Sequence, residues 1–225
     1  LSEEVEQLRK DLAETQSALE EKTRLPVVGV VPYLKVDIED EESLSDRLQQ
    51  KNAVKPLDAA IVRLPHISNF TDFMPLEQHP LLGVRYVQAA RELGMPDLII
   101  LPGTKNTVND LLWLRQCGLE TAVQKLARRG TPVLGVCGGY QMLGGMLDDF
   151  AGTESGRPQT LRGLELLPTR TVFTLEKRRA QVTATAAAPF AGAALTGYEI
   201  HTGRTTVGGA PFGTLADGTP DGCVQ

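Results

Sequence analysis

Cys137 stands in a glycine-flanked pattern, Gly-x-Cys-x-Gly, that runs from Gly135 to Gly139. The apolar residues 132–134 before it predict a buried strand, and residues 142–144 after it predict the start of a helix. A cysteine at such a junction is the thiol counterpart of a nucleophile elbow, and its glycines permit the sharp turn. Because unpaired N–H groups and the dipole of the following helix favour an anion, we predict a nucleophilic thiolate with a lowered pKa. The alternative, a buried structural cysteine, fits the longer pattern less well.

A second glycine-containing loop follows another predicted strand. Residues 101–107 read Leu-Pro-Gly-Thr-Lys-Asn-Thr and place Gly103 just after the strand over residues 97–101. In a parallel sheet, that strand and the one over residues 132–136 end at the same edge. We therefore predict that the N–H groups of Gly103 and Gly138 form an oxyanion hole for a tetrahedral acyl intermediate. The spacing of glycine and lysine does not fit a Walker A loop.

Three histidines could supply the base that a cysteine nucleophile usually needs, namely His66, His79 and His201. His66 ends the second predicted strand and His79 lies in a loop, so we expect both to be surface or capping residues. His201 lies in residues 197–205, downstream of the cysteine, and is the alternative base, with Glu199 as its carboxylate. Residues 199 and 201 share one strand face, but neighbouring side chains on one strand rarely form such a pair.

The composition is that of an ordinary globular protein. The 225 residues are 41% hydrophobic and 23% charged, and the formal net charge is −5, which argues against a nucleic-acid groove or an anionic membrane surface as partner. The sequence has no apolar run long enough to span a bilayer and no signal-peptide pattern. Three widely spaced cysteines argue against a disulfide framework and a zinc site, so we expect no metal and a cytoplasmic location.

Strands and helices alternate up to the cysteine. The predicted strands cover residues 25–31, 57–64, 97–101 and 132–136, and the predicted helices cover residues 80–92, 108–114 and 119–129. This alternation is typical of an α/β fold with a parallel sheet. Beyond residue 150 we predict short antiparallel strands, over residues 160–167, 171–175, 181–187 and 197–206.

The first 24 residues are polar and highly charged, with a regular stripe at spacings of four and three, formed by Leu1, Val5, Leu8, Leu12, Thr15 and Leu19. Such a heptad pattern predicts a helix. The sequence leaves open whether this helix packs on its own domain or is a coiled-coil arm or fusion. Residues 37–46 are acidic and predict a linker or an exposed helix start.

Several segments together resemble the glutaminase domains of the cobyric acid synthase family, which are class I glutamine amidotransferases of cobalamin biosynthesis. The segments are residues 26–33, 63–73, 101–107, 113–115, 135–141 and 197–205. The resemblance implies a flavodoxin-like α/β fold with a mainly parallel sheet. It also implies that Cys137 attacks the side-chain amide of glutamine, forms a γ-glutamyl thioester and releases ammonia. Gln141 resembles the residue that holds the glutamine, and Tyr140 is assigned to the same binding site.

The resemblance also implies partners outside this sequence. In the family, ammonia passes to an ATP-dependent synthetase domain that amidates carboxylates of adenosylcobyrinic acid a,c-diamide. ATP and Mg would bind that domain, and we expect no cofactor within residues 1–225. Residues 19–36 resemble only its final helix and strand, and residues 1–18 match nothing in the family. The family's base histidine lies in a Tyr-Leu-His-Gly-type motif that this sequence lacks, and His201 occupies a different family position.

We therefore divide the chain into an N-terminal amphipathic or coiled-coil helix, a synthetase tail with linker, and a C-terminally truncated amidotransferase domain, over residues 1–24, 25–50 and 51–225. We expect such a fragment to have little or no turnover. Two other functions stay open. One is the glutaminase subunit that amidates cell-wall lipid intermediates, which has a similar Cys-Gly-Gly-Tyr-Gln elbow. The other is a catalytically silent binding module. Residues 63–73 and 197–205 favour the corrinoid enzyme.

Overall fold

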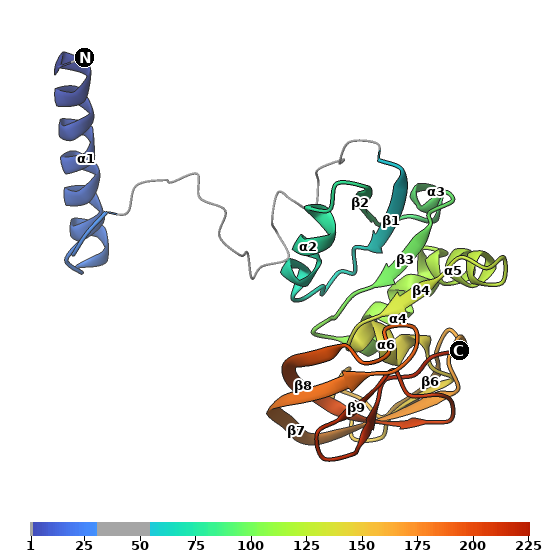
Figure 1. Ribbon diagram of the computed structural model, residues 1–225. Helices are drawn as coiled ribbons and strands as arrows, with labels where there is room; N and C mark the ends of the chain where they lie inside the picture. The colour runs from blue at the N-terminus through green and yellow to red at the C-terminus, as the bar shows by residue number, and fades with distance from the viewer. Residues whose placement is uncertain (1, 31–54) are drawn as a thin grey trace. The chain divides into compact units, whose positions relative to one another are not determined.

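The computed structural model describes residues 2–30 and 55–225, which belong to two compact units (Figure 1). The first unit contains α1 (Ser2–Thr23), the helix predicted from the heptad stripe. The side chains of Leu8, Leu12 and Leu19 in this stripe are exposed. Whether α1 forms a coiled coil stays a prediction.

The strand predicted over residues 25–31 is wrong for residues 25–30, and residue 31 lies outside the described residues. The Val27 N–H donates to the Glu20 carboxylate at 2.7 Å, and the Arg24 N–H donates to the Glu20 carbonyl at 2.8 Å. Leu25 and Val28 are exposed. An apolar, β-branched run needs a neighbouring strand to become one, and within the described ranges none pairs with this segment. The acidic segment 37–46 also lies outside the described residues.

The second unit contains a parallel sheet of four strands in the order β2–β1–β3–β4. Its strands are β1 (Leu57–Val62), β2 (Leu82–Val87), β3 (Leu98–Leu101) and β4 (Val133–Gly135). The central strands β1 and β3 are almost completely buried, as expected for apolar strands covered on both faces. The predicted strands over residues 57–64, 97–101 and 132–136 and the α/β fold class are therefore confirmed.

The helix predicted over residues 80–92 is wrong, because most of this segment forms β2. The strand pairs with β1 along its whole length, from Leu82 opposite Leu57 to Val87 opposite Val62. A short helix, α3 (Ala90–Leu93), covers only the end of the predicted range. Pairing with β1 decides the conformation here, since strand formation depends more on tertiary context than on local pattern.

The remaining described helices of the second unit lie around the parallel sheet (Figure 1). They are the 3₁₀ helix η2 (Phe70–Phe73), α2 (Met74–Glu77), α4 (Thr107–Gln116), α5 (Leu119–Ala127) and α6 (Gly138–Leu143). The helices α4 and α5 confirm the predictions over residues 108–114 and 119–129. In Figure 1, α6 lies between the two sheets, and it contacts β3, β4, β7 and α4. None of the described helices is long and apolar enough to cross a bilayer.

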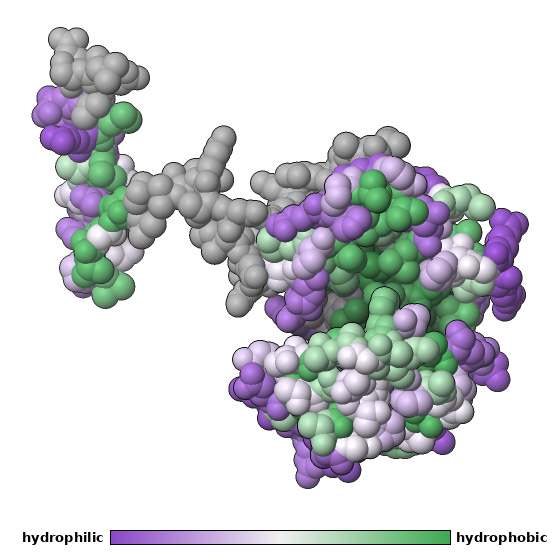
Figure 2. Space-filling model, in the orientation of Figure 1, coloured by the Kyte–Doolittle hydropathy of each residue, from purple (hydrophilic) through white to green (hydrophobic). Residues whose placement is uncertain are grey.

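A second sheet of mostly antiparallel strands follows α6. Its strands are β5 (Met146–Asp149), β6 (Gln159–Arg162), β7 (Thr169–Ala186), β8 (Ala194–Val207), β9 (Gly213–Leu215) and β10 (Pro220–Asp221). The two strands predicted over residues 171–175 and 181–187 are one long strand, β7, whose register against β8 shifts between Phe173 and Arg178. Figure 2 shows this part of the surface mainly in pale colours of intermediate hydropathy, in keeping with its many Thr, Ala and Gly residues.

Candidate active site

Cys137 occupies the sharp turn between β4 and α6. Its backbone has φ 49° and ψ −113°, a conformation that residues with a Cβ rarely adopt. The Gly139 N–H donates to the Val136 carbonyl at 2.8 Å, and the Gln141 N–H donates to the Cys137 carbonyl at 3.0 Å. The predicted strand-to-helix elbow is therefore present, and it presents the thiol at the start of α6.

The two glycines of the pattern are required by close backbone packing. A Cβ at Gly139 would lie 2.0 Å from the carbonyl oxygen of Leu101, at the end of β3. A Cβ at Gly135 would lie 2.6 Å from the Cα of Tyr140. Real side chains do not approach backbone atoms so closely, so only glycine allows α6 to rest on the ends of β3 and β4.

The two proposed oxyanion donors lie beside the nucleophile. A Cβ at Gly103 would be 3.7 Å from the Cβ of Cys137, which places the loop after β3 on the same side of the sheet as the thiol. The Gly138 backbone acts on the Cys137 thiol in the direction that lowers its pKa. A Cβ at Gly138 would lie 2.6 Å from the Cγ2 of Thr104, in the same loop. The structure thus brings Gly103, Gly138 and Cys137 together, while their catalytic roles stay a prediction.

The lowered pKa predicted for Cys137 is wrong. Burial of the sulfur raises the pKa of the thiol, and the nearby Glu154 carboxylate raises it further, against the opposing effect of the Gly138 backbone. The residue as a whole is exposed, but the surrounding protein removes water from the sulfur. Desolvation therefore outweighs the first N–H groups of α6, a helix of only six residues.

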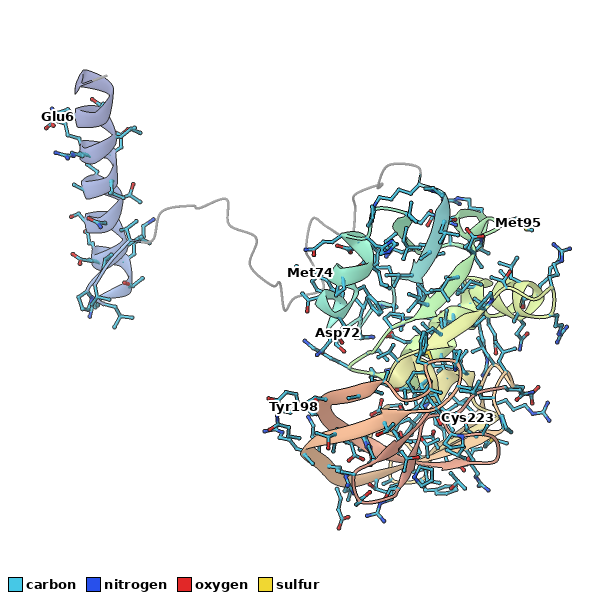
Figure 3. All side chains as sticks on the ribbon, viewed as in Figure 1. Glu6, Asp72, Met74, Met95, Tyr198 and Cys223 are labelled. Carbon is cyan, nitrogen blue, oxygen red and sulfur yellow. The ribbon has the colours of Figure 1, made fainter. Side chains whose placement is uncertain are left out.

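The two residues assigned to glutamine binding lie on different sides of α6. Gln141 is 7% exposed, and its Oε1 accepts a hydrogen bond from Thr107 Oγ1 at 3.2 Å. The Tyr140 hydroxyl is buried without a hydrogen-bond partner among the described residues. Burial, with smaller contributions from Cys223 and Asp221, raises the pKa of Tyr140 to about 12. Cys223 lies with the antiparallel strands in Figure 3, so the Tyr140 hydroxyl faces that part of the unit. Substrate binding by either residue stays a prediction.

His201 lies on β8 with both ring nitrogens engaged. Its Nδ1 is 2.6 Å from the Gly203 carbonyl oxygen, and its Nε2 is 2.8 Å from Glu199 Oε1. The expectation that residues 199 and 201 would not pair is therefore wrong, because long side chains two positions apart can lean together along a strand. Glu199 also forms an ion pair with Arg178. Both ring nitrogens therefore face acceptors from β8, and whether His201 acts as the base stays a prediction.

The other two histidines have local roles. His66 is half-exposed, and its Nδ1 lies 2.7 Å from Oδ1 of the buried Asp110. Asp110 also accepts hydrogen bonds from the His66 N–H and from Thr104 Oγ1, so it joins the loops after β1 and β3. His79 Nδ1 accepts from the Leu81 N–H at 3.3 Å. His79 thus caps a turn and His66 lies at the surface, as expected, but the contact of His66 with the buried carboxylate of Asp110 was missed.

A second missed carboxylate, Glu154, lies near the thiol. It comes from the loop between β5 and β6, and its Oε2 accepts from the N–H of Thr107, the first residue of α4, at 2.8 Å. Only the folded chain brings Glu154 to Cys137, so no local sequence pattern marks it. Across residues 2–30 and 55–225, no group of three or more His, Cys, Asp or Glu side chains is placed to hold a metal ion.

Two solved structures share the fold. One is described as a crystal structure of a glutamine amidotransferase, with a TM-score of 0.53 and 15% identity, over 72% of this chain and 82% of that one. The other is PurLQS from Thermotoga maritima, with a TM-score of 0.53 and 17% identity, over 75% of this chain and 78% of that one. Identities this low show the fold alone, and they confirm the flavodoxin-like α/β class.

Residues 58–225 match the CobB/CobQ-like glutamine amidotransferase domain, and the chain belongs to this family. It is similar to curated proteins named cobyric acid synthase. The one from Ruminiclostridium cellulolyticum is 49% identical over 187 residues, and the one from Lachnoclostridium phytofermentans is 50% identical over 188 residues. These alignments cover 80% and 81% of this chain but 36% of each relative. The resemblance found in the sequence is confirmed, and the chain spans little more than a third of these relatives' length.

We expect the substitution Gly139→Ala to destabilise the second unit strongly. Its methyl group would clash with backbone atoms of β3, which cannot rotate away as a side chain can. Overpacking of this kind lowers the free energy of unfolding by about 1–3 kcal/mol or more. Chemical denaturation followed by circular dichroism measures the change. Gly197→Ala is the control, because a Cβ there meets no atom within 4 Å. Equal losses in both variants would contradict the packing argument.

We expect Cys137 to react with iodoacetamide through a thiolate that forms only at raised pH. Because the folded protein raises the pKa of the thiol, the midpoint of the rate–pH profile should lie above that of free cysteine, about 8.5. Mass spectrometry of the labelled peptide separates Cys137 from Cys117 and Cys223, and Cys137→Ala gives the background. A midpoint below the free-cysteine value would restore the prediction made from the sequence.

Proposed function

We propose that this chain is a glutaminase domain in which Cys137 is the nucleophile. Its sulfur attacks the side-chain amide carbon of glutamine, and the carbonyl oxygen becomes an oxyanion held by the N–H groups of Gly103 and Gly138. The amide nitrogen is protonated and leaves as ammonia, which gives a γ-glutamyl thioester. Water then attacks the thioester, releases glutamate and restores the thiol. The strained position of Cys137 beside the Gly103 loop, in a chain of this family, carries the proposal.

The proton transfers in this scheme need a general acid–base, and His201 is a poor candidate. Its ring nitrogens are held by Gly203 and Glu199. The family resemblance assigns the base to a Tyr-Leu-His-Gly-type motif, which this sequence does not contain. Positioned acid–base catalysis contributes about 10²–10⁴-fold. We therefore expect residues 1–225 alone to be alkylated by glutamine analogues but to turn over glutamine slowly.

The wider role that we propose is the supply of ammonia for amide synthesis on a corrinoid. The relatives named cobyric acid synthase support this role, and most of their length lies outside the matched region. In this proposal a synthetase domain binds ATP, Mg and adenosylcobyrinic acid a,c-diamide, and the reaction takes place in the cytoplasm. The name of these relatives favours the corrinoid over a cell-wall lipid as the acceptor of ammonia.

A diazoketone analogue of glutamine should form a covalent adduct at Cys137. The analogue places an electrophilic carbon where the amide carbon of glutamine would lie, so a productive site alkylates its own nucleophile. Peptide mapping by mass spectrometry identifies the modified cysteine. We expect no adduct in Cys137→Ala. Labelling at Cys117 or Cys223 instead would refute the assignment, and absence of labelling would favour a silent binding module.

The substitution His201→Ala should leave labelling of Cys137 by this analogue unchanged within about twofold, because neither ring nitrogen is free to act on the thiol. Glutamine hydrolysis by the parent chain, His201→Ala and Cys137→Ala provides the second measurement. Rapid turnover that disappears in His201→Ala, while Cys137 still labels, would make His201 the base after all.

A further inference from the structure

The loop that carries Glu154 is fixed by a buried carboxylate. Asp149 is fully buried at the end of β5 and accepts hydrogen bonds from three successive N–H groups, those of Thr153, Glu154 and Ser155, at 2.6, 3.0 and 3.3 Å. Such a turn leaves the backbone of Glu154 little freedom. The direction of its side chain is therefore set by the fold.

This fixed side chain reaches the elbow. Glu154 Oε2 accepts from the Thr107 N–H at 2.8 Å, and Oε1 is 3.4 Å from the hydroxyl of Thr202 on β8. The hydroxyl of Thr107 in turn lies 3.0 Å from the place a Cβ on Gly138 would take. The carboxylate is thus separated from the backbone next to Cys137 by a single threonine side chain.

The charge on Glu154 has no cationic partner among the described residues, whereas other carboxylates in the unit do. Glu120 pairs with Arg115 at 2.8 Å, and Asp148 pairs with Arg170 at 2.6 Å. Burial raises the pKa of Glu154, and its carboxylate raises the pKa of the Cys137 thiol. The first effect disfavours the Glu154 carboxylate and the second disfavours the Cys137 thiolate, and a cation bound near both groups would stabilise both anions.

The substrate of the proposed reaction brings such a cation. Glutamine carries an α-ammonium group, which a short aliphatic chain separates from the amide carbon that Cys137 attacks. We propose that Glu154 binds the α-ammonium group of glutamine and thereby couples substrate binding to activation of the nucleophile. This inference rests on the glutaminase function proposed above and identifies a specificity residue for it.

In this proposal, binding of the ammonium group lowers the pKa of the Cys137 thiol. In the empty site burial raises the pKa of the Cys137 thiol and the Glu154 carboxylate adds a smaller effect of the same sign, so both disfavour the thiolate. A bound ammonium cancels the negative charge of Glu154 and adds its own attraction for a thiolate, so the nucleophile ionises more readily when its substrate is present. A glutamine analogue without the α-amino group would bind without this effect.

Binding to the Cys137→Ala variant tests the proposal without chemistry at the thiol. Isothermal titration calorimetry would compare glutamine with 4-carbamoylbutanoate, which lacks only the α-amino group. We expect glutamine to bind about tenfold more tightly, as for a hydrogen bond between charged groups. Adding Glu154→Gln should reduce this preference to less than about threefold, because the amide keeps an oxygen for the Thr107 N–H but has no charge.

A matched control is Glu176→Gln, which removes an exposed carboxylate paired with Arg204 on the β7–β8 hairpin. In this control the preference for glutamine should be unchanged. With Cys137 intact, Glu154→Gln should also move the iodoacetamide profile of Cys137 to lower pH, and Glu176→Gln should not. Should Glu154→Gln fail to fold by circular dichroism, Glu154→Asp retains the charge farther from the elbow, and an intermediate preference is then expected.

The outcomes separate this inference from the proposed function. If the preference for glutamine survives in Glu154→Gln, or in Glu154→Asp at its full size, the role of Glu154 is refuted while glutamine binding stands. If the Cys137→Ala variant binds neither compound and the parent chain is not labelled by the diazoketone, the glutaminase function itself is refuted.

Discussion

The direct contact between the backbones of α6 and β3 determines the geometry of the site. Gly139 lies so close to the Leu101 carbonyl that a methyl group cannot fit between them. This contact fixes where α6 begins, and the turn that precedes it forces Cys137 into its unusual backbone conformation. It also brings the loop after β3, with Gly103 and Thr104, beside the thiol. One contact between two backbones therefore places the thiol and both neighbouring glycines.

Three buried or partly buried carboxylates surround this arrangement and act differently. Asp110 and Asp149 are fully buried, and their oxygens accept hydrogen bonds from backbone and side-chain donors that hold loops in place. Glu154 is also hydrogen-bonded, but its charge acts on the Cys137 thiol. Hydrogen bonds from N–H groups stabilise a carboxylate, but the carboxylate keeps its negative charge and still shifts the pKa of nearby groups. The first two carboxylates therefore build the site, and the third sets its electrostatics.

The sequence contains the information for those parts of the site that are local. The glycine pattern around Cys137 predicts the turn, and the apolar runs predict β1, β3 and β4, because backbone geometry and burial act over a few neighbouring residues. The segment that becomes β2 has helical spacing, and only its alignment with β1 makes it a strand. The roles of Asp110 and Glu154, and the direction of the Cys137 pKa, depend on residues distant in the chain. Those features arise on folding and have no local pattern.

The backbone conformation of Cys137 has a consequence for how this position can change over time. Holding a residue with a side chain at φ 49° costs on the order of 1–3 kcal/mol, which glycine would largely avoid. Selection for stability alone would therefore favour glycine at position 137. Glycine already occupies the next two positions, 138 and 139. A lineage that no longer needed the thiol would gain stability by losing it. Cysteine at this position is therefore kept at a cost in stability, which agrees with the nucleophilic role proposed for its thiol.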